Sequence, residues 1–487
     1  MKAAHIAAYL FMIIASPLGA QETITLEAED GTQAGTQVSS NGDGYLGTGF
    51  VTGLDSPGDS YSVVAEIPVA GSYRIEFRYR GPQKKAQYLL VNGESVGNIM
   101  FPAAPDFTVV SGGGVYLPAG KATITIEKYW GYNDFDQIRL TPVPNHIYAP
   151  TPTLRDANAD ANTVALYNYL RGQYGKKILT GQNSYFDKLV ALAGREPRIR
   201  SYDFQNYSPH NPWGKGGTVW EGWDDGTTQQ IIGWHKSTGG RGIATIQWHW
   251  FSPLGGSLKT SVFYTKSTDF DVSLAVTSGT VENQALLRDI DAIAAQLQRL
   301  ERAGIPILWR PLHEAGGGWF WWGAKGSGPT LALWDILYER LTNHHNIHNL
   351  LWVWSTPEPD WYPGNDKVDV FGYDSYPGKL NYGTQKTTFD SMFELSRGER
   401  ILALTENGPI PDIDKLWQQD ARWAYFVSWS NLVASHNSAE HLARTFANSK
   451  AVTLGPAGCL DPPAGSEQSA RPSTTTLETT TPARHPR

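Results

Sequence analysis

The sequence predicts a multidomain protein, an N-terminal antiparallel β-sandwich followed by a (β/α)8 TIM barrel. Residues 21–143 carry short alternating or β-branched runs separated by glycine-rich turns, as in a sandwich. Residues 153–454 alternate strand-like and helix-like segments, as in a barrel. Between them, residues 144–152 hold closely spaced prolines and form a stiff linker. A chain of 487 residues is long enough for both cores.

The first residues, 1–20, have the pattern of a secretory signal peptide. Lys2 precedes an apolar segment over about 7–14, and small residues follow up to Ala20. The apolar segment is too short to cross a bilayer, and no other stretch is long enough. We therefore expect a secreted, extracellular protein without a membrane partner.

The amino-acid composition indicates which kinds of ligand and which kinds of catalysis the protein can have. A net charge of −7 and a pI near 6.0 argue against nucleic acid as the main partner. The 18 tryptophans exceed what a core usually needs, and many stand among glycines and polar residues, which indicates loops that face a ligand. Cys459 is the only cysteine, so the chain has no intramolecular disulfide and thiol catalysis has almost no support. We expect a monomer.

The clearest sandwich strands are the runs at 63–69, 73–79 and 122–127, which alternate or are rich in β-branched residues. The barrel then supplies eight candidate strands: 177–182, 198–204, 242–249, 305–312, 349–355, 368–374, 401–406 and 424–429. Residues 282–302 form the clearest helix, because leucine and isoleucine recur at spacings of three and four before Gly304. Residues 455–487 are rich in serine, threonine and proline, which predicts a disordered tail.

Two of the predicted barrel strands run into a glutamate. Glu314 lies just past the strand at 305–312, and Glu406 ends the strand at 401–406. The carboxyl ends of barrel strands carry the chemistry in enzymes of this fold. Glycoside hydrolysis needs one carboxyl as acid and a second that attacks or activates water, and aromatic side chains such as those after Glu314 suit sugar faces. The alternative is that each glutamate forms a rim salt bridge, for example with Arg310.

Several motifs resemble glycoside hydrolase family 26, chiefly endo-β-1,4-mannanases. They are Arg-Pro-Leu-His-Glu at 310–314, Gly-Gly-Trp-Phe-Trp-Trp-Gly at 317–323, Leu-Thr-Glu at 404–406, Leu-Thr-Gly-Gln at 179–182, Trp-His-Trp at 248–250 and Asp-Ser-Tyr at 374–376. The resemblance covers about residues 153–451. It implies a retaining double displacement with Glu314 as acid/base and Glu406 as nucleophile. Ala315 departs from the family pattern, in which methionine or a similar residue often follows the acid.

Further side chains are candidates for substrate binding. His313 would contact substrate or orient the acid, and the family pattern suggests that Tyr376 hydrogen-bonds the nucleophile. Four tryptophans are candidate sugar platforms, each also open to a simple core role: Trp319, Trp322, Trp250 and Trp429. Three more stand in a glycine-rich insertion that we place along the cleft: Trp213, Trp220 and Trp223. A zinc hydrolase is the rival, but neither His249 nor the pair His344 and His345 has a zinc-binding spacing.

The N-terminal domain opens with Glu27 and Glu29, whose side chains point the same way in an extended strand. Such a pair is either solvated or bridged by a cation such as calcium. The segment resembles carbohydrate-binding module family 35 through this Glu-x-Glu, Gly-Thr-Gly-Phe-Val at 47–51 and the run 130–136. The resemblance implies a structural calcium held by Glu27, Glu29 and Asp136, with Trp130 and Asn133 contacting sugar.

These observations predict a secreted, retaining endo-β-1,4-mannanase that hydrolyses internal bonds of mannan, glucomannan and galactomannan. Its partner would be a mannan-type polysaccharide of the plant cell wall, and its chemistry would need no cofactor. One alternative is the same machinery acting on mixed-linkage glucan or β-1,3-xylan. The other is a non-catalytic carbohydrate-binding protein.

Overall fold

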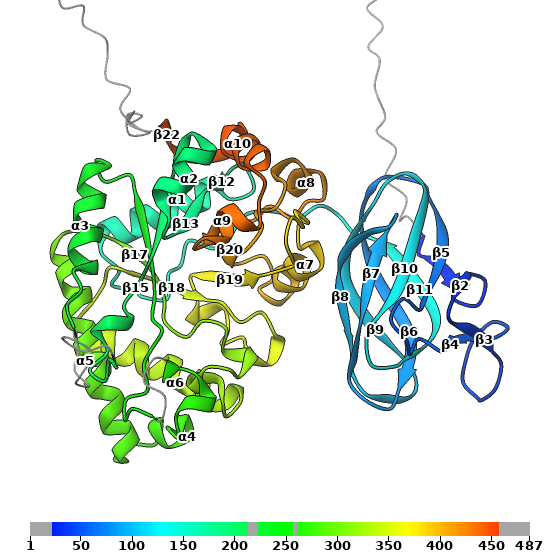
Figure 1. Cartoon of the computed structure of the whole chain (residues 1–487), viewed down its shortest axis with the longest axis horizontal. Coiled ribbons are helices and arrows are strands. Elements are labelled where there is room, and N and C mark those ends of the chain that lie inside the picture. Colours follow the sequence, from blue (N-terminus) through cyan, green and yellow to red (C-terminus); the bar gives the residue numbers. More distant parts are fainter. Residues whose placement is uncertain (1–21, 213–222, 257–260, 457–487) are drawn as a thin grey trace, which may run out of the picture.

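The computed structural model describes residues 22–212, 223–256 and 261–456. The predicted signal peptide, Trp213, Trp220, Cys459 and nearly all of the predicted tail lie outside these residues. Among the described residues, no helix combines the length and apolar character needed to cross a membrane. Figure 1 shows the two predicted domains side by side, the sandwich in blue to cyan and the barrel in green to orange.

The N-terminal domain is a sandwich of two antiparallel sheets, as predicted. The first has the order β3-β4-β11-β6-β9 with β1 beside β11, and the second has the order β2-β5-β10-β7-β8. Side chains of both sheets fill one core, which includes Phe77, Phe101 and Phe135. The strands are β1 Ile24–Glu27, β2 Thr32–Ala34, β3 Gln37–Ser39, β4 Phe50–Thr52, β5 Ser60–Ile67, β6 Gly71–Gly81, β7 Lys85–Val91, β8 Glu94–Phe101, β9 Ala104–Leu117, β10 Gly120–Trp130 and β11 Asp134–Pro142.

The second domain is a closed barrel of eight parallel strands, which confirms the predicted fold class. Its strands are nearly all buried, because helices cover the outside and side chains fill the inside. In barrel order they are β13 Gly181–Asn183, β15 Ile199–Asp203, β16 Ile243–Gln247, β17 Ile307–Arg310, β18 Leu350–Trp354, β19 Val370–Ser375, β20 Ile401–Asn407 and β21 Phe426–Trp429. Five of these strands lie within their predicted ranges, whereas β13, β19 and β20 extend one residue past the predicted end.

The base of the barrel differs from the prediction. The predicted strand at 177–182 is divided into β12 (Ile178–Leu179) and the barrel strand β13. β12 pairs in parallel with β22 (Ala451–Pro456), which also pairs with β14 (Arg195–Pro197). The last strand thus ends two residues beyond the expected boundary at 454, because those residues find partners near the start of the domain.

Ten α-helices are present in the described part of the chain: α1 Ala161–Gln173, α2 Phe186–Ala193, α3 Thr227–Ser237, α4 Val272–Ala275, α5 Val281–Arg302, α6 Ser327–Tyr338, α7 Lys386–Leu395, α8 Ile413–Gln418, α9 Leu432–Ser435 and α10 Ala439–Ala447. The longest, α5, matches the predicted helix at 282–302. The Thr280 side chain caps it by accepting a hydrogen bond from Asn283 N. Gly304 follows its end with φ of 70°.

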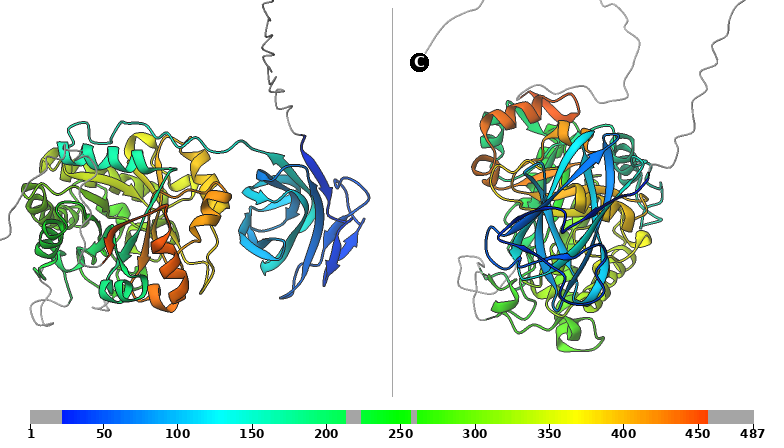
Figure 2. Two further views of the ribbon diagram at one scale, coloured as in Figure 1. Left: turned by 90° about the horizontal axis from the view of Figure 1, so that it is seen from above. Right: turned by 90° about the vertical axis from the view of Figure 1, so that its right-hand side faces the viewer.

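The sandwich packs against α7 through β9, and the left view of Figure 2 shows the sandwich beside the barrel. Thr387 Oγ1 donates a hydrogen bond to Gly114 O over 3.3 Å. A Cβ on Gly114 would lie 1.2 Å from Asp390 Oδ2, so this close approach requires glycine. His146 of the linker pairs with Asp420 at 2.9 Å, and its ring packs against Phe393. The linker is therefore fixed to the barrel, and the two domains share a packed interface.

Candidate active site

Glu406 lies near the end of β20, a strand whose residues are all buried. Its two carboxylate oxygens have different partners. Oε2 accepts a hydrogen bond from Arg310 Nη2 over 2.6 Å, and Oε1 accepts one from the Tyr376 hydroxyl. These charge-assisted bonds fix the carboxylate in orientation.

Arg310, the last residue of β17, joins several groups inside the barrel. Its Nη1 lies 2.6 Å from Asp374 Oδ2, and its Nη2 lies 2.7 Å from Gln247 Oε1. Although burial lowers the pKa of Arg310, the charges of Asp374 and Glu406 raise it above its ordinary value. Burial raises the pKa of Asp374 well above its usual range, even though Arg310 opposes this. The salt bridge with Arg310 that was considered for each glutamate is therefore present for Glu406, and Arg310 makes its second salt bridge with Asp374.

Glu314 follows β17 in the left-handed region, with φ of 54°. A non-glycine residue in this region is uncommon, and such strain is often found at functional sites. One oxygen from each of Glu314, Asp374 and Glu406 lies within 4.8 Å of the other two. Burial, followed by the charge of Glu406, raises the pKa of Glu314. The site therefore places Glu314, whose raised pKa suits a general acid, beside Glu406, which is paired with Arg310.

Trp319 and Tyr376 border the opening above these carboxylates. Trp319 Nε1 donates a hydrogen bond to Glu314 Oε2 over 3.0 Å, and its side chain is 48% exposed. Tyr376 is 45% exposed, although its hydroxyl reaches Glu406. With Tyr373 and Glu358 they line an open cavity of about 380 Å³, which we call the catalytic groove.

His249 and His313 form a pair next to the three carboxylates, a pairing that was not predicted from the sequence. Asp203 ends β15, and its Oδ2 accepts a hydrogen bond from His249 Nδ1 over 2.5 Å. His249 Nε2 lies 3.2 Å from His313 Nε2. Although burial lowers the pKa of His249, Asp203 raises it above its ordinary value, whereas burial and the neighbouring His249 lower that of His313. The sequence signal for this pair is that Asp203 ends one strand and His249 follows the next, which lies parallel to it.

Three residues that were predicted to contact sugar are instead buried in the barrel. Trp250 is fully buried, stacks on Trp248 at 3.8 Å and bonds Asp289, so it is not a sugar platform. Trp322 is also fully buried, and its Nε1 donates to His313 O. His313 itself is enclosed beneath Phe320 and cannot touch substrate directly, although it adjoins Glu314.

The other tryptophans differ in position. Trp429 ends β21, is partly exposed and lies 6.2 Å from the His249 ring, at the same end of the barrel as the carboxylates. Trp223 is 41% exposed, and its backbone N–H bonds Asn206 O. The two clusters of three potential metal ligands among the described residues consist of carboxylates alone, and neither contains a histidine of the zinc alternative.

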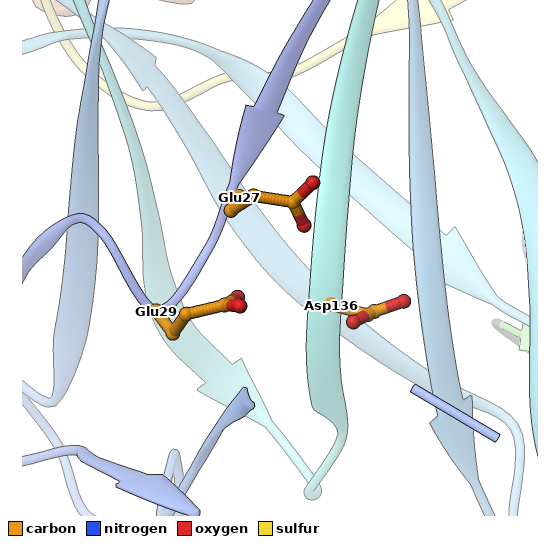
Figure 3. Close-up of side chains that lie close together, drawn as sticks. All are labelled: Glu27, Glu29 and Asp136. Carbon is orange, nitrogen blue, oxygen red and sulfur yellow. The ribbon is translucent and has the colours of Figure 1, made fainter. Parts of the chain in front are cut away.

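The sandwich brings together the three predicted calcium ligands, as Figure 3 shows. One oxygen from each of Glu27, Glu29 and Asp136 lies within 4.8 Å of the others. Glu27 Oε2 and Glu29 Oε2 are buried without a hydrogen-bond partner. Burial raises the pKa of Glu27 and of Asp136, and Glu29 adds to both increases. Arg78 donates to Asp136 but leaves the two glutamate oxygens unpaired.

Of the two residues of the sandwich that were predicted to contact sugar, one is exposed and the other is buried. Trp130 ends β10 and is 41% exposed, with Lys85 Nζ 5.1 Å above its ring. Asn133 is fully buried, and its Oδ1 accepts a hydrogen bond from Gln87 Nε2. Asn133 therefore supports the sheet from inside and does not contact sugar.

Comparison with known proteins agrees with this geometry. Residues 155–456 match the model of glycosyl hydrolase family 26, and residues 24–143 match that of carbohydrate binding module family 35. A mannan endo-1,4-beta-mannosidase of Thermothelomyces thermophilus is 39% identical over 444 residues, 88% of this chain and 89% of that protein. The crystal structure of a Podospora anserina GH26-CBM35 beta-(1,4)-mannanase is 37% identical, with a TM-score of 0.61 over 89% of this chain and 98% of that one. A ruminal GH26 endo-beta-1,4-mannanase is 28% identical with a TM-score of 0.67 over the same shares.

Proposed function

We propose that this chain, which belongs to glycosyl hydrolase family 26 and is therefore a glycoside hydrolase, cleaves internal β-1,4-mannosidic bonds of mannan-type polysaccharides. The observation that carries the proposal is that Glu314, which lines the catalytic groove, has one carboxyl oxygen within 4.8 Å of an oxygen of the buried Glu406. Similar proteins named as mannanases, matched over most of this chain, support the substrate.

The spacing of the pair supports a retaining mechanism. Carboxyl groups that act with retention lie about 5–5.5 Å apart, whereas inverting enzymes leave about 6.5–9.5 Å for a water molecule. In this site one oxygen of Glu314 lies within 4.8 Å of one of Glu406. This separation is closer to that of retaining enzymes than to that of inverting enzymes.

The reaction then proceeds in two displacements. Glu406 attacks the anomeric carbon and forms a glycosyl ester, while Glu314 gives its proton to the departing glycosidic oxygen. Glu314 next removes a proton from water, whose oxygen displaces Glu406 from the same carbon. Burial raises the pKa of Glu314, which favours the proton that the first step needs, and the hydrogen bond from Arg310 orients Glu406 for attack. No cofactor takes part.

The sandwich serves as a carbohydrate-binding module with a structural calcium. Calcium takes six to eight oxygen ligands, and the two orphaned glutamate oxygens with Asp136 fit part of such a shell. Trp130 offers an exposed aromatic face for a sugar ring. A module joined to the barrel raises the local concentration of substrate. Secretion is the corresponding location, because polysaccharides of the plant cell wall lie outside cells.

The direct test compares the wild type with Glu406→Ala on galactomannan, glucomannan, mixed-linkage glucan and β-1,3-xylan, with products resolved by size. We expect a series of manno-oligosaccharides from the wild type alone. Products from a glucan or xylan alone would overturn the substrate. Binding without products would leave a carbohydrate-binding protein.

Two further measurements separate the roles of the pair. Proton NMR of the first products should show the β-anomer before mutarotation, and an α-anomer would exclude retention. Glu314→Gln should lose activity on polysaccharide by about 10²–10⁴-fold. It should still release a dinitrophenolate from an activated aryl mannoside in the first turnover, because that leaving group needs no proton. Equal loss on both substrates would remove Glu314 from the acid role.

A further inference from the structure

A second groove lies between the sandwich and the barrel and adjoins the catalytic groove. It encloses about 330 Å³, within the range of roughly 300–1,000 Å³ that is usual for ligand sites. Its lining includes Tyr88, Asn98 and Tyr129 from the sandwich and Tyr376, Asn381 and Gln385 from the barrel. We call it the interdomain groove.

The sandwich wall of this groove presents two aromatic rings. Tyr88 on β7 and Tyr129 on β10 have ring centroids 4.5 Å apart, and Tyr129 is 45% exposed. The pairing of β10 with β7 shifts register between Lys128 and Trp130, which places Tyr129 at a bulge. Such a bulge re-aims a side chain. Asn98 lies opposite Tyr88 on β8 and adds an amide beside the rings.

Two observations connect the interdomain groove to the carboxylates. Tyr373 and Tyr376 line both grooves, and Tyr376 donates its hydroxyl hydrogen to Glu406. The second observation concerns Glu358 of the barrel. Burial raises its pKa, and the positive charge of Lys84 in the sandwich opposes this increase, so Lys84 lies near Glu358. Glu358 in turn borders the catalytic groove beside Gly316. The sandwich therefore flanks the cleft.

The charges of the lining indicate the class of ligand. Glu94 and Lys415 are its two charged residues, and they pair with each other across the domains at 2.9 Å. The remaining polar groups are hydroxyls and amides, which suit sugar hydroxyls. An anionic ligand would find no unpaired cation among these residues. Tyrosine faces with neutral hydrogen-bonding groups match an uncharged sugar chain.

We propose that the interdomain groove is a distal glycan subsite, in which Tyr88 and Tyr129 bind sugar units of the same chain that lies across Glu314 and Glu406. The proposal rests on the function proposed above and extends it. In this arrangement the sandwich completes the substrate cleft, in addition to any binding through Trp130. A long neutral oligosaccharide contacts both domains at once, whereas a short one contacts the barrel alone.

The test measures kcat/KM on manno-oligosaccharides from mannotriose to mannooctaose for the full chain, Tyr88→Ala and Tyr129→Ala. Each variant should match the wild type on the shortest substrate that is cleaved, which also shows that the barrel is folded. Each should lose about three- to tenfold on the longer ones, the effect of one lost aromatic contact. Tyr116→Ala, a half-buried tyrosine of β9 outside this lining, is the matched control and should equal the wild type throughout.

The outcomes separate the two proposals. Inactivity of the wild type on every manno-oligosaccharide would overturn the proposed function itself. An active wild type with unchanged tyrosine variants at all lengths would overturn the subsite alone. A loss of equal size at every length would also overturn it, since the tyrosines would then act through Tyr376 on the reaction centre. Tyr88→Phe, which keeps the ring, should retain most of the long-substrate rate if stacking is the cause.

Discussion

Trp319 Nε1 donates a hydrogen bond to Glu314 Oε2 over 3.0 Å, so a half-exposed tryptophan directly contacts the proposed acid. A donor of this kind favours the ionised carboxylate and opposes the increase in pKa that burial causes. The indole thus limits how far the pKa of Glu314 is raised.

Trp319→Phe tests this relationship, because phenylalanine keeps an aromatic face and lacks the donor. The pKa of Glu314 should increase further. A general acid works while protonated, so activity is lost as the pH rises through its pKa. The basic limb of kcat/KM should therefore move upward by about half to one pH unit. An unmoved limb, or one shifted downward, would contradict the assignment.

Tyr376→Phe should reduce kcat on mannan about 10–100-fold, the effect of one hydrogen bond to a charged group. Folding should be unaffected, because the substitution removes only the hydroxyl group from a residue that is 45% exposed. Tyr185→Phe is the control, since Tyr185 is similarly exposed and lies outside the carboxylate cluster. Equal rates for both variants would remove Tyr376 from the reaction centre.

Calcium should stabilise the sandwich. At a concentration one hundred times its Kd, a ligand that binds only the folded state adds about 2.7 kcal/mol to the free energy of unfolding. Calorimetry of the full chain should show the transition of the sandwich moving to higher temperature with calcium. Glu29→Gln should abolish the shift, whereas Glu66→Gln, an exposed acid of β5, should keep it. A shift of equal size in both variants would exclude this cluster as the site.

Asp289 should make stability depend on pH. It is fully buried and accepts hydrogen bonds from Trp250 and Arg288, and burial raises its pKa to about 7. Between its ordinary value of 3.8 and about 7 the folded state binds more protons than the unfolded state. Stability therefore falls as the pH rises through this window, by an amount on the order of a few kcal/mol, and changes no further above it.

Asp289→Asn checks this expectation, because an amide cannot ionise and still accepts a bond from Trp250. Urea unfolding should give a free energy of unfolding that falls less between pH 5 and pH 8 than in the wild type. A parallel pH profile in the two proteins would show that Asp289 titrates normally.

The barrel strands and the two glutamates could be predicted from sequence because each signal is local. A buried parallel strand is a continuous apolar run, and a carboxylate at its end reaches the rim. Glu314 and Glu406 both meet this description. The first predicted strand was too long because its early residues pair with β22, a contact across the whole domain.

The fate of individual aromatics could not be predicted in this way. Trp319 and Trp322 stand three residues apart in one motif, yet one is exposed and the other is buried. The backbone turns sharply at Gly318, where φ is 67°, and again at Trp321–Gly323. These two turns direct the side chains of Trp319 and Trp322 to different sides. Residue type gives the affinity for a sugar face, but only the path of the backbone decides which way the ring points. Asn133 faces inward for the same reason.

The order of strands around the barrel has a consequence for synthesis on the ribosome. All strand partners in the sandwich lie between Ile24 and Pro142, so this domain can fold while the barrel is still being made. The barrel closes only when β21 meets β13, at Trp429 and Asn183. Such distant pairings form late. The newly emerging α7 therefore meets a completed β9, and the sandwich provides a preformed surface on which the last third of the barrel assembles.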